Sequence, residues 1–233
     1  MLKMIKYELL GSYRQFFVSF LVFLGLCFII PWMPDSIFLQ VGTFGVSTLM
    51  LIMIGMLFYN AISYYQRTMF KRQGYLTLTL PVSPYALVGA KVISTLIWLV
   101  LGVFVLFIGF MVFVMILGQI ELDMLIQGIK DFFANWSYFY TDLLKGLGLF
   151  LSNSALSVVY IFGVITFVHT HWFKKHRALW GIMIYFLGNF GYNYALSQIN
   201  LDTTVLFCVV PLVLSVIVFY ALVYLLKYHI EVE

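Results

Sequence analysis

Residues 92–117, VISTLIWLVLGVFVLFIGFMVFVMIL, decide the fold class because they contain no Asp, Glu, Lys, Arg or His. A helix rises about 1.5 Å per residue, so about 20 apolar residues cross the roughly 30 Å of hydrocarbon in a bilayer. Similar stretches without these five residue types occur at 16–33, 41–63, 146–168, 178–196 and 204–226. Because a backbone in lipid must satisfy its own hydrogen bonds, and the runs are far longer than barrel strands, the sequence predicts an all-α polytopic protein with six transmembrane helices.

The composition of the whole chain excludes a water-soluble globule. Of its 233 residues, 64% are hydrophobic and 9% are charged, whereas about a quarter of the residues in a soluble domain are charged. The sequence has no linker rich in Pro, Gly or Ser and no internal repeat, so residues 1–233 are predicted to form a single transmembrane domain. Cys27 and Cys208 lie in apolar runs and are interpreted as small buried side chains.

The distribution of basic residues predicts the orientation in the membrane. If six spans alternate, 11 of the 13 basic residues fall on one side, which should be the cytoplasmic side. Lys130 and Lys145 fall on the other side, and both termini are predicted to be cytoplasmic. The 11 residues are Lys3, Lys6, Arg14, Arg67, Lys71, Arg72, Lys91, Lys174, Lys175, Arg177 and Lys227.

Two segments outside the spans have an amphipathic pattern. Residues 1–15 are expected to form an interfacial elbow helix on the inner leaflet, because apolar residues recur there at steps of three or four. Residues 120–143 carry a similar stripe between the third and fourth spans. This outer segment is interpreted as a helix that anchors at the membrane surface, and the alternative is a lid or exit gate for a substrate.

The chain lacks the motifs of energy coupling and catalysis. It has no Gly-x-x-x-x-Gly-Lys-Ser/Thr loop and no insertion long enough for an ATP-binding domain, so it is not expected to be an enzyme by itself. The absence of ionisable residues from the six spans argues against ion or proton coupling. The histidines His169, His171 and His176 are read as part of a basic cytoplasmic turn, and neither catalytic residues nor a metal site are predicted.

The most informative connection is residues 64–91, which contain four basic residues and no acid. Three of these residues occur at helical spacing, and a glycine and two prolines follow them, so a short helix, a break and a rigid turn are predicted. Lys91 is expected to extend its ammonium group to the headgroups at the entrance of the next span. The residues behind this prediction are Arg67, Lys71, Arg72, Gly74, Pro81 and Pro84.

The run Gly74-Tyr75-Leu76-Thr77-Leu78-Thr79-Leu80-Pro81-Val82-Ser83, followed by Lys91, resembles the cytoplasmic-loop motif of ABC-2-type (type V exporter-like) permeases. The resemblance is strongest to small bacterial members, which are encoded beside a separate ATPase. In that family the loop forms a coupling helix that docks in a cleft of the ATPase subunit. The resemblance implies an ATPase-coupling role for Arg67, Lys71, Arg72, Gln73, Gly74, Tyr75, Pro81 and Ser83.

Two features depart from the family pattern. The outer loop at 197–203 is short and leaves little room for the helical hairpin that larger relatives place before their last span. Many relatives carry acids just before the Gly-Tyr-Leu-Thr run, whereas this chain has Lys71-Arg72-Gln73, so the ATPase cleft should be more acidic. The alternative interpretation is a basic loop that only binds anionic lipid and fixes the topology.

The resemblance also implies the assembly and its place in the cell. It implies two permease chains, as a homodimer or heterodimer, and two cytoplasmic ABC ATPase chains in the bacterial cell membrane. ATP and Mg²⁺ would bind the ATPase, no cofactor is expected on this chain, and no nucleic acid partner is predicted.

The walls of the spans predict the class of cargo. Uncharged, aromatic-rich walls favour a hydrophobic or amphipathic molecule. The resemblance to small permeases implies a peptide, such as a bacteriocin, toxin or antimicrobial peptide, and the alternatives are lipids and hydrophobic drugs. Candidate cavity residues are Asn60, Asn153, Asn189 and Asn193, for which hydrogen bonds between helices are the alternative role. The rival function is a non-transporting membrane scaffold or a peptide-sensing assembly factor.

Overall fold

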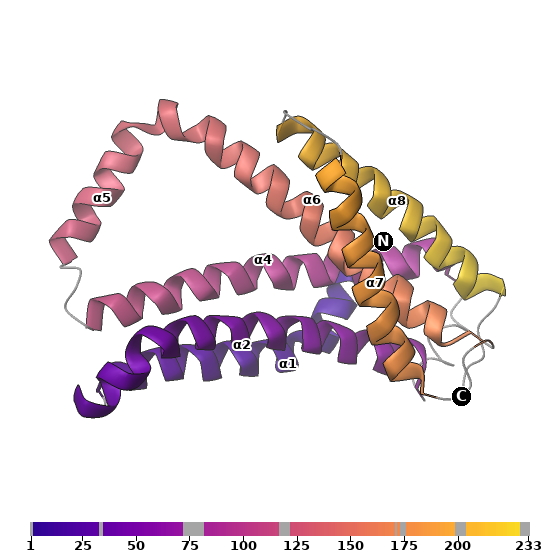
Figure 1. Ribbon diagram of the computed structural model, residues 1–233, viewed down its shortest axis with the longest axis horizontal. Coiled ribbons are helices and arrows are strands. Elements are labelled where there is room, and N and C mark those ends of the chain that lie inside the picture. The colour runs from indigo at the N-terminus through magenta and orange to yellow at the C-terminus, as the bar shows by residue number, and fades with distance from the viewer. Residues whose placement is uncertain are drawn as a thin grey trace. The chain divides into compact units, whose positions relative to one another are not determined.

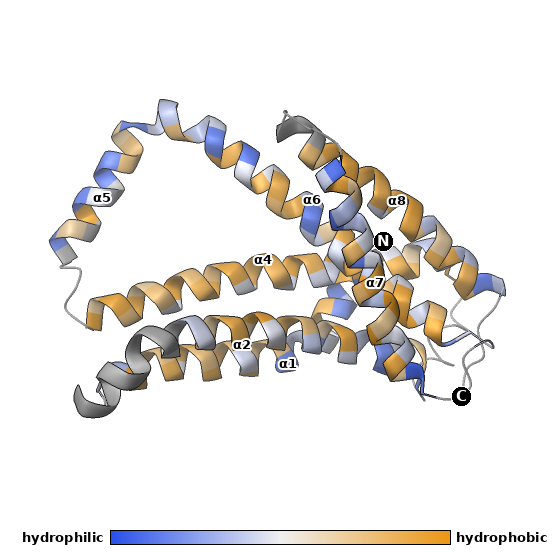
Figure 2. Cartoon of the chain, in the orientation of Figure 1, coloured by the Kyte–Doolittle hydropathy of each residue, from blue (hydrophilic) through white to orange (hydrophobic). Residues whose placement is uncertain are grey.

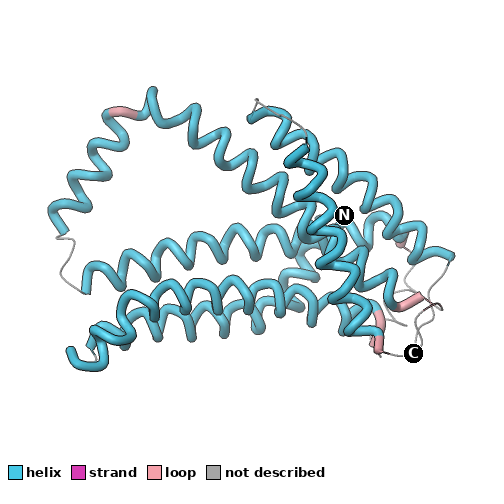
Figure 3. Tube along the Cα trace, viewed as in Figure 1, coloured by secondary structure: helices cyan, strands magenta, loops and turns pink. Residues whose placement is uncertain are grey.

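The computed structural model describes residues 2–32, 35–71, 82–116, 122–170, 172, 176–198 and 204–228. In these ranges the chain forms seven α-helices and one short 3-10 helix, and it has no strand, so the predicted all-α class is confirmed (Figures 1 and 3). The helices are α1 (Leu2–Ile29), η1 (Ile30–Trp32), α2 (Asp35–Met69), α4 (Pro84–Ile116), α5 (Leu122–Ala134), α6 (Trp136–Val168), α7 (Arg177–Gln198) and α8 (Thr204–Tyr228).

Five helical segments in the described part of the chain are long and apolar enough to cross a membrane, which indicates a membrane protein. Each overlaps one of the six predicted spans, and they are Leu2–Trp32, Ser47–Met69, Pro84–Ile116, Tyr138–Val168 and Phe207–Tyr228. Figure 2 shows the mostly hydrophobic colour of α4 and α8. Helix α7 has 22 residues, but its glycines, asparagines and tyrosines make it less apolar than the five. The crossing of residues 178–196 therefore stays a prediction.

The chain divides into two compact units. One consists of Met1–Glu8, Ile62–Leu96 and Leu143–Glu233, and the other of Leu9–Ala61 and Ile97–Asp142. Helices α1, α2, α4 and α6 each contribute residues to both units, so the boundary between the units falls within four continuous helices.

The second unit is held by an aromatic and glycine contact between α1 and α4. The ring of Trp98 stacks on Phe16, with centroids 5.0 Å apart, and its indole Nε1 donates a hydrogen bond of 2.9 Å to Ser12 Oγ. Further along the same pair of helices, a Cβ atom on Gly109 would collide with the ring of Phe23. Because glycine lacks that atom, the two helices approach closely at this point.

Helix α1 runs without a break from Leu2 to Ile29 and so joins the predicted elbow, residues 1–15, directly to the first predicted span. The placement of the elbow on the inner leaflet stays a prediction. Gly11 is the weakest helix former near the expected break, and one glycine costs only about 1 kcal/mol in a helix. Ser12 and Phe16, which flank the expected junction, are both 1% exposed. Packing of these side chains therefore favours one continuous helix.

Helix α2 also continues past its predicted end at residue 63, as far as Met69. Arg67, expected at the start of the short coupling helix, instead belongs to the last turn of α2. In the outer segment 120–143, the described residues belong to α5 and the first part of α6, separated only by a turn at Asn135. The placement of this segment on the membrane surface stays a prediction.

Candidate functional site

In the predicted cytoplasmic loop, residues 64–91, the structure describes residues at the two ends. At the end of α2, Arg67 and Lys71 are exposed, whereas the intervening Thr68, Met69 and Phe70 are buried. This helix end thus presents its positive charges outward and packs its apolar side chains inward. The predicted coupling residues Arg72, Gln73, Gly74, Tyr75 and Pro81 lie outside the described residues.

Ser83, at the other end of the loop, caps α4. Its hydroxyl oxygen accepts a hydrogen bond of 3.4 Å from the amide of Ala86, and its carbonyl oxygen accepts from the amides of Ala86 and Leu87. Pro84 follows at the first helical position, where a missing N–H costs nothing. The structure therefore gives Ser83 a capping role at the start of α4.

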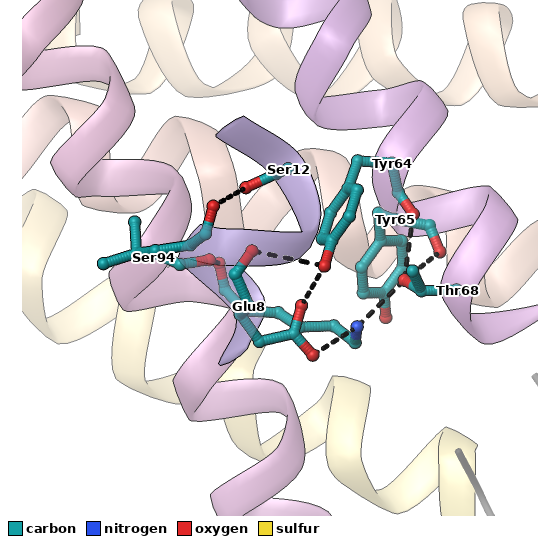
Figure 4. A network of polar contacts seen from close by, with 8 residues as sticks. Glu8, Ser12, Tyr64, Tyr65, Thr68 and Ser94 are labelled. Carbon is teal, nitrogen blue, oxygen red and sulfur yellow. Dashed lines mark hydrogen bonds and ion pairs between the residues drawn. The ribbon is translucent and has the colours of Figure 1, made fainter. Parts of the chain in front are cut away.

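A buried ion pair connects three helices within the first unit. The ammonium Nζ of Lys91, on α4, lies 2.8 Å from the carboxylate Oε1 of Glu8, on α1. The same Nζ donates a hydrogen bond of 2.9 Å to Oγ1 of Thr68, on α2. Tyr64, one turn earlier on α2, donates a hydrogen bond of 2.8 Å to Oε2 of Glu8. We call these four residues the Glu8–Lys91 clasp, and Figure 4 shows Glu8, Tyr64 and Thr68 gathered at this point.

The clasp corrects the prediction that Lys91 extends to the headgroups. Lys91 is 2% exposed, and its ammonium also lies 5.4 Å from the centre of the Tyr64 ring. A buried charge is tolerated when an opposite charge and hydrogen bonds compensate it, and here both carboxylate oxygens of Glu8 are engaged. Sequence reasoning missed Glu8 as a functional candidate, although it is the only acidic residue in the first 34 positions.

The end of α2 is also attached to α6. The ring of Tyr65 stacks on Phe162, with centroids 4.0 Å apart, and its hydroxyl shares a hydrogen bond of 2.9 Å with Thr166. Two residues beyond Thr68, Phe70 stacks on the imidazole of His169, with centroids 4.2 Å apart. The helix end that carries Arg67 is therefore held on one side by the clasp and on the other by the end of α6.

A cavity of about 510 Å³ lies between α6, α7 and α8 in the same unit. Three of the four predicted polar residues line it: Asn153 from α6, and Asn189 and Asn193 from α7. The two asparagines of α7 are one helical turn apart and so share a face. The aromatic part of the cavity wall consists of Tyr160, Tyr185 and Tyr192, and the apolar part includes Leu214 and Val218 of α8.

The fourth candidate, Asn60, lies in the other unit and does not line this cavity. Its Nδ2 donates hydrogen bonds of 2.8 Å to Ser19 Oγ and 3.4 Å to the carbonyl oxygen of Gln15, both on α1. Asn60 is 9% exposed. It therefore makes the hydrogen bonds between helices that were the alternative role for these residues.

Gly188 leaves space for the Tyr160 side chain in the wall of the cavity. A Cβ atom at this position would overlap the hydroxyl of Tyr160. That hydroxyl donates a hydrogen bond of 2.8 Å to the carbonyl oxygen of Ile184, which joins α6 to α7. Sequence reasoning did not single out Gly188 or Tyr160, because their proximity depends on the packing of two helices.

The described residues contain no group of three His, Cys, Asp or Glu side chains close enough to hold a metal ion. His169, from the histidine cluster, has its ring Nδ1 within 2.7 Å of the carbonyl oxygen of Ile165. His171 lies outside the described residues.

Comparison with known proteins gives no match to this chain, whether to protein-family models, to curated proteins or to solved structures. The resemblance to ABC-2-type permeases therefore rests, at the level of sequence, on residues 64–91.

Proposed function

We propose that this chain is the transmembrane subunit of an ATP-driven exporter, an ABC-2-type permease that works with a separate cytoplasmic ATPase. In this proposal six helices span the bacterial cell membrane and both termini are cytoplasmic. Two permease chains and two ATPase chains form the complex, and ATP and Mg²⁺ bind the ATPase. The cargo is hydrophobic or amphipathic, with a peptide as the leading candidate.

The observation that carries the proposal is the Glu8–Lys91 clasp. Its Lys91–Thr68 hydrogen bond joins α4 to α2, the two helices that the cytoplasmic loop connects. Glu8 attaches the same point to α1. A force applied to the loop would therefore act on three apolar helices together, as a passive subunit driven by a partner requires.

The route from the loop to the cavity supports the same function. Tyr65 and Phe70 attach the end of α2 to the end of α6, at Thr166 and His169. Asn153, 13 residues before Thr166 on the same helix, lines the cavity, a separation of about 20 Å along a rigid helix. Movement of the loop end would thus be transmitted to one wall of the cavity.

The test is ATP hydrolysis by a reconstituted complex. The chain should copurify with an ATPase encoded beside it, and in liposomes the complex should hydrolyse ATP faster when cargo is added. Replacing Arg67 and Lys71, both exposed, with Glu should abolish cargo-stimulated hydrolysis, because two carboxylates would then repel an acidic cleft. Membrane insertion should be unaffected, since neither side chain is buried.

The matched control is Lys130→Glu, an equally exposed charge reversal on α5, which should leave hydrolysis unchanged. Unchanged hydrolysis in the Arg67→Glu, Lys71→Glu variant would refute the docking assignment. Copurification with an ATPase whose activity never responds to cargo would instead favour a scaffold or sensing role.

A further inference from the structure

The carboxamides of the cavity between α6, α7 and α8 offer a ligand mainly hydrogen-bond acceptors. The Nδ2 of Asn153 donates 2.8 Å to the carbonyl oxygen of Leu149, and the Nδ2 of Asn193 donates 2.8 Å to that of Asn189. Asn189 donates in the same way to Tyr185, at 3.2 Å. A backbone carbonyl can only accept, so these contacts fix which end of each amide faces its own helix.

The oxygen atoms of these amides keep their accepting capacity. Within the part of the chain that the structure describes, no donor is bonded to Oδ1 of Asn153, Asn189 or Asn193. Each carbonyl oxygen has two lone pairs. The cavity thus brings three unfilled acceptors together from two helices.

The aromatic walls add an attraction for positive charge. Tyr160 and Tyr185 lie with ring centroids 5.7 Å apart, and the hydrogen bond from Tyr160 to Ile184 fixes the first ring. The electron-rich face of such a ring attracts an ammonium group within about 6 Å of its centroid. Tyr192 lines the same cavity.

The remaining lining residues decide between classes of ligand. None of the described residues that line the cavity is charged, so an anionic head would find no cation there. Each amide keeps one further N–H against two lone pairs on its oxygen, so acceptors outnumber the donors that the amides offer. An entirely apolar ligand would leave those oxygens without donors, which costs free energy once water is displaced. The volume of about 510 Å³ lies within the roughly 300–1,000 Å³ typical of small-ligand sites.

We therefore propose that this cavity binds an amphipath with an apolar tail and an amine or ammonium head that donates N–H hydrogen bonds to Asn153, Asn189 and Asn193. The use of the site for cargo rests on the proposed function. The binding itself is measured without an ATPase, so the two ideas can fail separately.

The experiment compares two probes of equal tail length, octylamine and octanoate. The full-length chain is placed in nanodiscs of zwitterionic lipid, and binding is followed by calorimetry after subtraction of partitioning into protein-free nanodiscs. We expect saturable binding of octylamine at least tenfold tighter than that of octanoate. Asn189→Leu and Asn193→Leu should each weaken octylamine binding by about tenfold, as expected for the loss of one hydrogen bond to a charged group.

The matched control is Asn135→Leu. Asn135 also donates to a carbonyl oxygen one turn earlier, that of Asp131, at 3.0 Å, but it does not line the cavity. This variant should bind octylamine like the unmodified chain.

A second variant controls for the possibility that the Leu variants lose binding because they misfold. Asn193→Asp adds a carboxylate to the same wall and should strengthen octylamine binding while weakening octanoate binding. Equal affinity for the two probes, absence of saturable binding, or Leu variants that bind normally would each overturn the proposal. Octylamine binding without any ATPase response to cargo would leave the inference standing and count against the proposed exporter.

Discussion

The Glu8–Lys91 clasp predicts a large and specific loss of stability when one charge is removed. In Lys91→Met, the Glu8 carboxylate keeps its hydrogen bond to Tyr64 but loses the positive charge 2.8 Å away. Removing one partner of a buried pair costs about 3–5 kcal/mol. Because the Glu8 side chain is 14% exposed, we expect the lower end, about 3 kcal/mol.

The double variant separates the ion pair from simple changes in packing. Glu8→Gln alone leaves the Lys91 ammonium buried without a counter-charge, whereas Glu8→Gln with Lys91→Met removes both charges. The double variant should therefore be destabilised by about 2 kcal/mol less than the sum of the two single variants, the coupling expected of contacting residues. Unfolding in mixed micelles of dodecyl maltoside and SDS, followed by tryptophan fluorescence, measures these differences.

The exposed Lys130 of α5 provides the reference, and Lys130→Met should change stability by no more than about 0.5 kcal/mol. Our reasoning is refuted if Lys91→Met is as mild as Lys130→Met, or if the two single effects simply add.

Three further substitutions test other contacts. Asn60→Leu should destabilise the chain by about 1 kcal/mol in the same unfolding assay, because it removes the hydrogen bonds to Gln15 and Ser19. Unchanged stability would show that these hydrogen bonds do not contribute to it. Ser83→Ala should cost about 1 kcal/mol through loss of the α4 cap, and equal stability would show that the cap is dispensable. Gly188→Ala should displace the Tyr160 hydroxyl and weaken octylamine binding several-fold, and calorimetry that finds full affinity would contradict the predicted overlap.

The apolar runs predict the helices well, because each run must satisfy its backbone hydrogen bonds by itself. They predict helix ends poorly. Helix α2 continues to Met69 because Tyr65 and Thr68 find partners on other helices, which no local pattern records. In the same way α1 continues through Gly11, where Ser12 and Phe16 are buried.

The sequence also predicts only part of what the candidate polar residues do. The spacing of Asn189 and Asn193 is enough to place them on one face of a helix. The sequence does not indicate that Asn153 lines the same cavity, or that Asn60 instead bonds to α1. The sequence predicts that Lys91 reaches the headgroups because its counter-charge, Glu8, lies 83 residues away and no local pattern pairs the two. Pairings of this kind depend on tertiary packing, and one sequence carries no direct signal for them.

The most direct test of the proposed function is vectorial transport in liposomes that contain the purified chain, with and without its ATPase. We predict that a fluorescent amphipathic peptide crosses the membrane only when both the ATPase and ATP are present, because this chain supplies the pathway and its partner supplies the energy. Accumulation of the peptide against its gradient by the chain alone would contradict the proposal.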